Sequence, residues 1–564
     1  MKLIKLGVAA ALGLALIATA WVSWNRPQRV DMADYAPADA LVYLECNSLL
    51  DVKRTVTSTD AWREMSPLLE AGGVEGPGSW LSRLIYWTGI GPTPAVILTR
   101  AQLAMVMIDL GTKEEGTTLT FKPEAAILIE THTSERRMRP TVEDALRQLA
   151  EKTYAQPTMQ KRDLGGTELI VWSAPSGDRQ IMAAIDGTLV IVGNSERAVK
   201  ACLDVHHDQR PSLRNDPELQ QLRSQMATSS ALAFGFVSSA NVARLLSVAV
   251  PVLLSRTAGD LRFERILADS ASRISTGIGW SSRGVGGGIE DRYLFSLKPG
   301  LVSRLDQAFR STETRGQAAQ FLPEGVHSVT FYNFEDPLAA WKGFESTVSS
   351  RVDTLSAMLF TSVFKSALTP YGIKDAEKFL GMVGPEVTTT RLTRNSNHSV
   401  LIATVRDEPG LRRLLLEPQG RELKRSLVEG VELIENPDDE IAVSFMAGSI
   451  LIGPPEDVRN CIQTGIGKNE TANQQRFDHF LPFSQTVGIV TYANDSQRVF
   501  DFFMTLARAT GSAQKLRDST DRSSRLARLP YSATETKLGD QGFERRTRSP
   551  LGQFSTLVPQ LLPN

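Results

Sequence analysis

The sequence GTLVIVGNSERAVKACLDV, residues 187–205, reads as a strand, a glycine and a helix. Residues 189–192 are apolar and rich in β-branched side chains, and Gly193 interrupts this run. Asn194 or Ser195 then supplies an N-cap for a helix whose apolar residues recur at helical spacing on one face. Two interpretations are open for such a turn: it binds a ligand, or it is one element of a larger architecture.

A similar order returns in GSILIGPPEDVRNCIQTG, residues 448–465. Gly453 again follows the strand, and two prolines suit the first turn of a helix. Cys461 takes the position that Cys202 has in the first segment, so both thiols are predicted to lie in helical core positions. A phosphate loop needs GxxxxGK[ST], and a dinucleotide-binding turn needs GxGxxG. Neither segment has these glycines, so we interpret the turn as architecture.

Further pairs of segments match in the same order along the chain. They are PADALVYLECN at 37–47 with PEGVHSVTFYN at 323–333, TGI at 88–90 with YGI at 371–373, GTELI at 166–170 with GVELI at 430–434, GFVSSAN at 235–241 with GIVTYAN at 488–494, and GIEDRY at 288–293 with GFERRT at 542–547. Six collinear matches, counting the glycine turn, are improbable by coincidence. The predicted fold is α+β: a tandem duplication of a mixed unit with an antiparallel sheet and covering helices, preceded by an N-terminal membrane segment.

The expected division of the chain follows from these matches. Residues 1–26 are a signal-anchor or signal peptide, 35–300 the first α+β repeat, 321–550 the second, and 551–564 a C-terminal tail. The stretch around 300–320 contains STETRGQ and is predicted to be a polar connection with no apolar period.

Polar turns between apolar runs predict antiparallel hairpins. The sequence places them at 104–121, 276–297, 388–405 and 531–549. Helices are expected at 59–73, 242–256, 349–368 and 499–509, and another begins with Thr141 as its cap.

The N-terminus carries an export signal. Lys2 and Lys5 precede an uncharged run at 6–24, and Arg26 follows it. A basic flank before an apolar run is typical of a segment that enters the membrane while its lysines stay cytoplasmic. Ala18-Thr19-Ala20 is a candidate cleavage site, but the run approaches the roughly 20 residues that span a bilayer. A cleaved signal peptide and a retained single-pass anchor both stay open.

Either outcome predicts a location in the cell envelope. The expected arrangement is a single pass through the inner (cytoplasmic) membrane, with the C-terminal region on the periplasmic side.

Composition sets further bounds. With 564 residues, of which 42% are hydrophobic and 22% charged, the chain has ample material for several cores. A net charge of −1 and the lack of long like-charge tracts argue against a nucleic-acid partner. The three cysteines have no metal-ligand spacing and are predicted to be reduced, packed thiols.

No catalytic, cofactor-binding or metal-binding residues are predicted. GxSxG and HExxH are absent, and the six histidines show no metal-ligand spacing. SAQK at 512–515 fits the SxxK pattern of penicillin-recognising enzymes but lacks convincing SDN and KTG partners. His206 and His207 follow a helix, where imidazoles contact terminal carbonyls. GVGGG at 284–288 separates two strand-like runs and predicts a wide hairpin turn.

Three stretches carry a family resemblance: YAPADALVYLECNSL, GTLVIVGNSERAVKACLD and ERRTRSPLG. At these residues the chain resembles a bacterial exported family known only as domain-of-unknown-function family 3352, and the resemblance covers most of the region after the N-terminal segment. It implies a bacterial, envelope-located protein with an N-terminal anchor. It supplies no catalytic residues to carry over.

The leading hypothesis is a non-enzymatic envelope protein that acts as a binding or scaffolding module. Its expected partners are the cytoplasmic membrane, through the N-terminal segment, and an envelope protein or lipid. One alternative is a carrier of a lipid or other apolar ligand in a cavity between sheet and helices, which the apolar stretches 242–256 and 499–509 suggest. The other is an unrecognised hydrolase. No cofactor is expected.

Overall fold

The computed structural model describes residues 29–70, 101–115, 118–154, 156–177, 179–242, 244–245, 273–312, 317–350, 361, 365–396, 398–417, 423–438, 440–467, 488–509 and 511–561. The described strands form one sheet of 20. Every pairing between these strands is antiparallel.

The first ten strands form one half of the sheet, in the order β4–β5–β6–β7–β3–β2–β1–β8–β9–β10. Their bounds are β1 Val42–Cys46, β2 Gln102–Glu115, β3 Thr118–Glu130, β4 Thr158–Leu164, β5 Thr167–Ser173, β6 Gln180–Asp186, β7 Leu189–Gly193, β8 Ala233–Ser238, β9 Ser275–Val285 and β10 Gly288–Leu297.

The last ten strands form the other half, in the order β14–β15–β16–β17–β13–β12–β11–β18–β19–β20. Their bounds are β11 Ser328–Asn333, β12 Val383–Arg391, β13 Val400–Val405, β14 Lys424–Val428, β15 Val431–Asn436, β16 Ile441–Met446, β17 Ser449–Gly453, β18 Ile489–Ala493, β19 Ser532–Gly539 and β20 Gly542–Ser549. The strand order within the two halves is the same.

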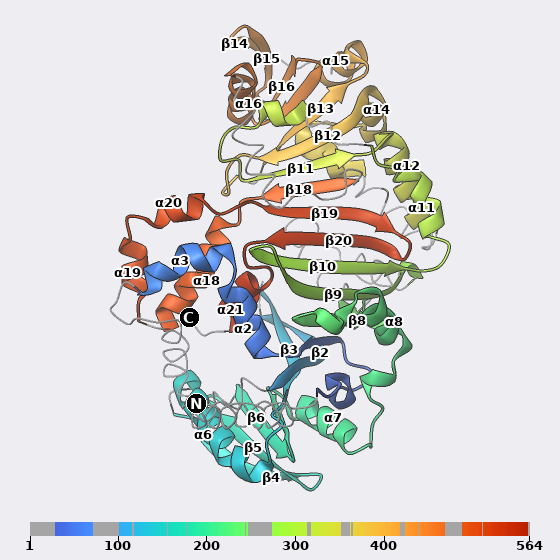
Figure 1. The fold of residues 1–564 in the computed structure, drawn as a ribbon. Coiled ribbons are helices and arrows are strands. Elements are labelled where there is room, and N and C mark those ends of the chain that lie inside the picture. Colours follow the sequence, from blue (N-terminus) through green and yellow to red (C-terminus); the bar gives the residue numbers. More distant parts are fainter. Residues whose placement is uncertain are drawn as a thin grey trace, which may run out of the picture.

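β10 and β20 join the halves into one sheet. They pair from Ile289 opposite Ser549 to Ser296 opposite Gly542, and Figure 1 shows them side by side in the middle of the molecule. The predicted architecture, a tandem duplication of a mixed α+β unit preceded by a membrane segment, is therefore corrected to a single antiparallel sheet of 20 strands with helices. Unpaired backbone groups along two facing edges are costly, and pairing satisfies them.

The N-terminal part of the fold prediction finds no support in the structure. Residues 1–26 lie outside the described residues. Among the helices that the structure describes, none has both the length and the apolar character needed to cross a membrane.

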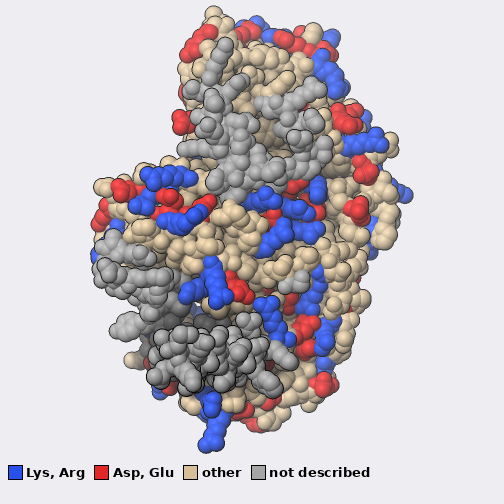
Figure 2. Space-filling model, in the orientation of Figure 1, with Lys and Arg blue, Asp and Glu red and all other residues tan. Residues whose placement is uncertain are grey.

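We call the pairing of β10 with β20 the joint, and ion pairs cross it on one face of the sheet. Glu290 of β10 is 1% exposed and accepts hydrogen bonds from Arg283 of β9 at 2.7 Å and from Arg548 of β20 at 2.9 Å. Burial alone would raise the pKa of Glu290, but these two guanidinium groups lower it below its ordinary value. Arg292 of β10 pairs with Glu544 of β20 at 2.6 Å. Figure 2 shows the resulting gathering of Lys and Arg over the middle of the sheet, where β19 and β20 lie.

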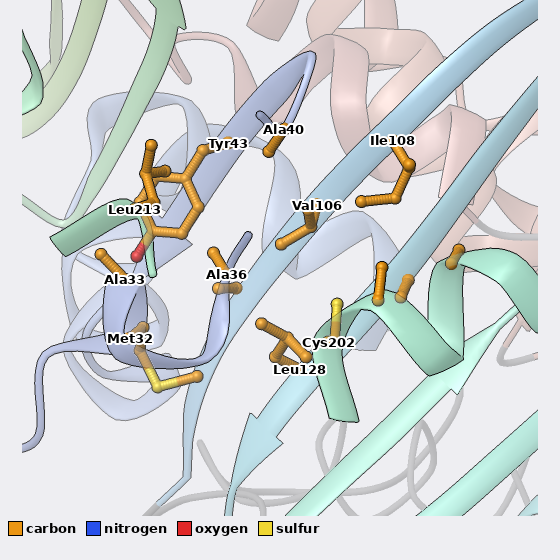
Figure 3. Close-up of a cluster of buried hydrophobic side chains, with 14 of the residues drawn as sticks. Met32, Ala33, Ala36, Ala40, Tyr43, Val106, Ile108, Leu128, Cys202 and Leu213 are labelled. Carbon is orange, nitrogen blue, oxygen red and sulfur yellow. The ribbon is translucent and has the colours of Figure 1, made fainter. Parts of the chain in front are cut away.

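One face of the sheet is covered mainly by three helices: α7 (Glu196–His206), α8 (Pro217–Gln225) and α16 (Pro455–Gly467). Short 3-10 turns add to this layer at η1 (Met32–Tyr35), η2 (Leu213–Asn215) and η4 (Gln317–Phe321). Alternate residues of the strands supply the core beneath them, since successive side chains point to opposite faces. In Figure 3, Cys202 of α7 lies beside Leu128 of β3.

The opposite face is covered by a larger set of helices. Over the first half lies α6 (Glu135–Tyr154), which packs on Ile170, Trp172 and Ile185. Over the second half lie α12 (Pro337–Ser349), η5 (Ser366–Tyr371), α14 (Ala376–Met382) and α15 (Glu408–Leu416). Near the joint lies α11 (Val302–Ala308).

A helical cluster holds distant parts of the chain together. It combines α2 (Leu49–Thr57) and α3 (Asp60–Glu70) with α18 (Ser496–Ala509), α19 (Ala513–Asp518), α20 (Arg522–Ala527) and α21 (Phe554–Leu561). Trp62 of α3 meets Phe503 of α18 with ring centroids 5.4 Å apart, and Ile289 of β10 lies beneath them. The N-terminal and C-terminal helices therefore share one core.

Several local predictions are confirmed. The four expected hairpins are present as β2–β3, β9–β10, β12–β13 and β19–β20. The turn after β9 is tighter than the predicted wide loop, because Gly286 and Gly287 alone connect the strands and both have positive φ.

Two local predictions are wrong. α6 begins at Glu135 rather than after Thr141, since Met138 is fully buried against Ile185 and Val190 and this packing extends the helix across Pro140. The stretch around 300–320 is not a plain polar connection, because it contains α11. The expected helices at 242–256 and 349–368 lie largely outside the described residues.

Candidate functional site: an apolar cavity between the sheet and its helices

The strand–glycine–helix turn is formed as predicted, and its glycines serve packing. Ser195 caps α7 by accepting a hydrogen bond from the amide of Ala198. A Cβ on Gly193 would lie 3.1 Å from the carbonyl oxygen of Ala125, at the start of the paired region of β3. A Cβ on Gly453 would lie 3.0 Å from the Cα of Val400 in β13. Glycine at these positions lets the neighbouring strand approach, so the turn is architectural.

The cysteines are structural thiols. Cys202 and Cys461 are fully buried, each in the core beneath its own helix. Burial raises the pKa of Cys202 and of Cys461 to about 12. Neither side chain is a thiolate at neutral pH, and all three cysteines are free.

The structure does not assemble the other motifs into a reactive site. Of the SxxK pattern, Ser512 is buried just before α19, whereas Lys515 is exposed on that helix. His207 is the C-cap of α7, and its Nε2 lies 2.6 Å from Oδ2 of Asp186. Within the described chain, no three His, Cys, Asp or Glu side chains lie close enough to hold a metal ion.

A cavity of about 880 Å³ lies near the pairing of β10 with β20. Its floor comes from strands β10–β13 and β18–β20, and its roof comes from α11, α12, η5 and α14. The walls are rich in aromatic side chains: Phe295, Phe309, Tyr332, Phe334, Trp341, Phe344, Tyr371 and Phe543. No described residue that lines it carries a charge. Cavities with such walls favour apolar ligands over water.

Edge-to-face ring contacts build one end of the cavity. The ring of Phe309, at the C-cap of α11, lies 5.3 Å from Phe334, 5.6 Å from Phe543 and 6.2 Å from Phe344, measured between centroids. This T-shaped geometry is favourable because the positive edge of one ring meets the negative face of the next. The aromatic rings therefore give this end of the cavity a fixed shape.

The polar side-chain groups among the described lining residues are the indole N–H of Trp341 and five hydroxyls. The hydroxyls belong to Thr347, Thr389, Thr536, Tyr332 and Tyr371. The hydroxyl of Tyr371 lies 2.5 Å from Oγ of Ser399, and burial raises the pKa of this phenol. The walls thus offer neutral polar contacts at neutral pH.

Sequence reasoning missed this site. The apolar helix at 499–509, which suggested a ligand cavity, is present within α18 but packs into the helical cluster instead. The usable signal was the spacing of Leu301, Leu305 and Phe309, which is the i, i+4, i+8 pattern of one helical face. This pattern lay in the stretch interpreted as a polar connection.

Comparisons with known proteins give no further guidance, since no family model, no curated protein and no solved structure matches the chain.

Proposed function

We propose that this protein binds an apolar ligand of lipid size in the cavity between the sheet and α11, α12 and α14. The cavity volume of about 880 Å³, with uncharged, mainly apolar walls that include eight aromatic residues, is the observation that supports the proposal. At about 30 Å³ for each water-sized group, this volume holds roughly 29 such groups. One long or two shorter hydrocarbon chains have this size.

The energetics of transfer favour such a ligand. Burial contributes about 0.8 kcal/mol per methylene group, so a 12-carbon chain gains about 10 kcal/mol. Association removes at least about 4 kcal/mol of this gain. The remainder, about 6 kcal/mol, corresponds to a dissociation constant of tens of micromolar, and longer chains bind more tightly.

The proposed setting is the cell envelope. The basic residues and uncharged run at 2–24 support export, with the described region on the periplasmic side of the inner membrane. A non-enzymatic binding or carrier role fits that setting, because transfer of a hydrocarbon chain from a membrane to water costs about 0.8 kcal/mol per methylene group and an apolar protein cavity offsets this cost.

Fluorescence quenching tests for occupancy of the cavity. A dodecanoic acid brominated on its chain is titrated into the protein, and quenching is expected because Trp341 lines the cavity. Trp341→Phe should lose most of the quenching, whereas Trp62→Phe, in the helical cluster, should retain it. Equal quenching in the native protein and in Trp341→Phe would contradict the proposal.

Filling the cavity is a second test. Ala340 lines the cavity and is 5% exposed, whereas Ala339, its neighbour on α12, is exposed to solvent. Ala340→Phe places a ring in the cavity and should weaken binding at least about tenfold, since the ligand then loses several methylene contacts. Ala339→Phe is the matched control and should leave the affinity unchanged. Unaltered binding by Ala340→Phe would place the ligand elsewhere.

A further inference from the structure

A polar hollow of about 250 Å³ lies at one end of strands β11, β12 and β13. Glu386 of β12 lines it and precedes Val387, which lines the apolar cavity, so these two side chains face opposite sides of the sheet. Asn333 of β11 pairs with Glu386 and shares its face. Thr404 of β13 follows Ala403, the partner of Val387, and therefore lies on that face as well. The hollow thus collects polar side chains from three neighbouring strands, across the sheet from the apolar cavity.

An irregularity in β12 shapes the floor of this hollow. Residues 384–386 of β12 face Thr404 alone, so the strand bulges there. A Cβ on Gly384 would collide with Oγ1 of Thr404, and glycine at this position lets the two strands approach. Bulges often occur beside active sites, where they change the direction of a side chain. The side chain of Glu386 leaves the strand at the end of this bulge.

Glu386 carries a buried oxygen atom that has no partner. The residue is 6% exposed, and its Oε1 accepts a hydrogen bond from the amide of Ala318 in η4 at 3.0 Å. Its Oε2 has no hydrogen-bond partner in the part of the chain that the structure describes. An unpaired buried acceptor is destabilising, and such atoms are rare in folded proteins. Because Glu386 lines the hollow, a donor bound there can reach Oε2.

The first half of the sheet contains a corresponding position whose polar groups are paired. β2 lies beside β1 there as β12 lies beside β11 in the second half, and Gln102 of β2 corresponds to Glu386. Oε1 of Gln102 accepts a hydrogen bond from the amide of Val30 at 2.8 Å, much as Oε1 of Glu386 does from η4. Nε2 of Gln102 donates to the carbonyl oxygen of Val30 at 2.9 Å and to Oδ1 of Asn47 at 3.5 Å. Glutamate has an acceptor where this glutamine has a donor, so the second position lacks N–H groups that a ligand can supply.

Arg406 supplies the opposite charge at the rim of the hollow. It is exposed and lines the hollow, two residues after Thr404. The amide of Arg406 donates to the carbonyl oxygen of Met382 at 2.9 Å, which continues the pairing of β12 with β13 and keeps Arg406 on the face of Thr404. Glu386 and Arg406 are the charged side chains among the described lining residues, and the other polar ones are neutral: Thr312, Gln317, Asn333 and Thr404. A ligand that carries both charges therefore fits the hollow better than a simple anion or cation.

We infer that this hollow binds a small zwitterion, whose primary ammonium group donates to Oε2 of Glu386 and whose carboxylate accepts hydrogen bonds from Arg406. At about 30 Å³ for each water-sized group, the hollow holds roughly eight non-hydrogen atoms, which is the size of a small α-amino acid. Hydrogen bonds between opposite charges are roughly twice as strong as neutral ones, so both ends of the ligand contribute to affinity. The hollow and the apolar cavity lie on opposite faces of the sheet, so the inference does not depend on the proposed function.

Three matched compounds test the two charges separately. L-Serine carries both charges, ethanolamine lacks the carboxylate, and 3-hydroxypropanoate lacks the ammonium group. Each compound is titrated into the full chain by calorimetry at pH 7.5. L-Serine is expected to bind at least about tenfold more tightly than either analogue, because each analogue loses one charge-assisted contact.

Variants locate the two contacts. Glu386→Gln copies the arrangement of Gln102 and should weaken L-serine binding at least about tenfold, because the amide nitrogen takes the place of the ammonium group. Glu324→Gln is the matched control, since Glu324 is exposed and does not line the hollow. Arg406→Gln should lower the affinity for L-serine to that for ethanolamine and leave ethanolamine binding unchanged. Arg413→Gln, exposed on α15, is the control for this variant.

The outcomes separate the parts of the inference. Absence of L-serine binding overturns the site itself. L-Serine binding that survives in Glu386→Gln overturns the contact assigned to the ammonium group, and equal binding of L-serine and ethanolamine overturns the contact with Arg406. Thermal unfolding checks that each variant is folded, and the exposed Arg406 provides the test if Glu386→Gln does not fold. Quenching by the brominated acid reports on the other face of the sheet, so the proposed function is tested separately.

Discussion

Asp291 makes the stability of the joint depend on pH. This carboxylate of β10 is 1% exposed, and it accepts hydrogen bonds from Nε1 of Trp280 at 3.1 Å and from the amide of Gln553 at 2.9 Å. Burial raises the pKa of Asp291 to about 6, although these donors and Ser282 act to lower it. The neighbouring Glu290 raises it further.

The sign and size of the effect follow from this pKa. The folded protein holds the proton on Asp291 more tightly than the unfolded chain, in which the ordinary value is 3.8. Protonation of Asp291 therefore stabilises the folded protein. This contribution is fully present below about pH 4 and is lost as the pH rises through about 6. At about 1.4 kcal/mol for each pH unit, the gap between 3.8 and about 6 corresponds to about 3 kcal/mol.

Asp291→Asn tests this reasoning. The amide cannot ionise, so the difference in free energy of unfolding between native protein and variant should fall by about 3 kcal/mol from pH 4 to pH 7.5. Urea unfolding at a series of pH values measures the difference. Asp375→Asn is a control of opposite sign, because the amide and side chain of Lys378 lower the pKa of Asp375, and its effect should change only below about pH 4. Parallel curves for native protein and Asp291→Asn would refute a desolvated carboxylate at this position.

Three other perturbations have defined outcomes. Gly542→Ala should destabilise the protein by about 2–4 kcal/mol in thermal unfolding, because Gly542 has a φ of 139° and a Cβ would collide with the backbone of β10. Gly539→Ala is the control: this glycine lies in the same hairpin and has room for a Cβ, so the variant should change thermal stability little. Iodoacetamide at pH 8 should leave Cys202 and Cys461 unmodified in the folded protein and alkylate both in urea, as mass spectrometry will report, and rapid labelling without urea would contradict their burial. Ser195→Ala should cost about 1 kcal/mol through loss of the α7 cap, measured by chemical denaturation.

Local structure could be predicted from the sequence where the residues of a short segment determine its conformation. The glycine turns at Gly193 and Gly453 and the four hairpins depend on neighbouring residues, and their patterns gave the correct elements. The start of α6 was not readable, because it depends on Met138 packing against strands some 50 residues further along the chain.

Long-range organisation was harder to predict because it depends on partners that no local pattern encodes. Whether β10 ends one sheet or continues into another depends on β20, far along the chain. The cavity likewise takes its walls from residues between Ile274 and Phe543, brought together only by the completed sheet. The apolar spacing around Leu305 showed a buried helical face but not what that face covers.

The pairing of β10 with β20 has a consequence for synthesis of the protein. β10 ends at Leu297, and β20 begins only about 245 residues later. At translation rates of about 5–20 residues per second, the ribosome needs on the order of 10–50 s to deliver the missing partner. During that interval the backbone amide and carbonyl groups along this edge of β10 have no partner strand, and they can pair with a strand of another copy of the protein. A chain that terminates before residue 542 lacks β20, so the edge of its β10 stays without this partner.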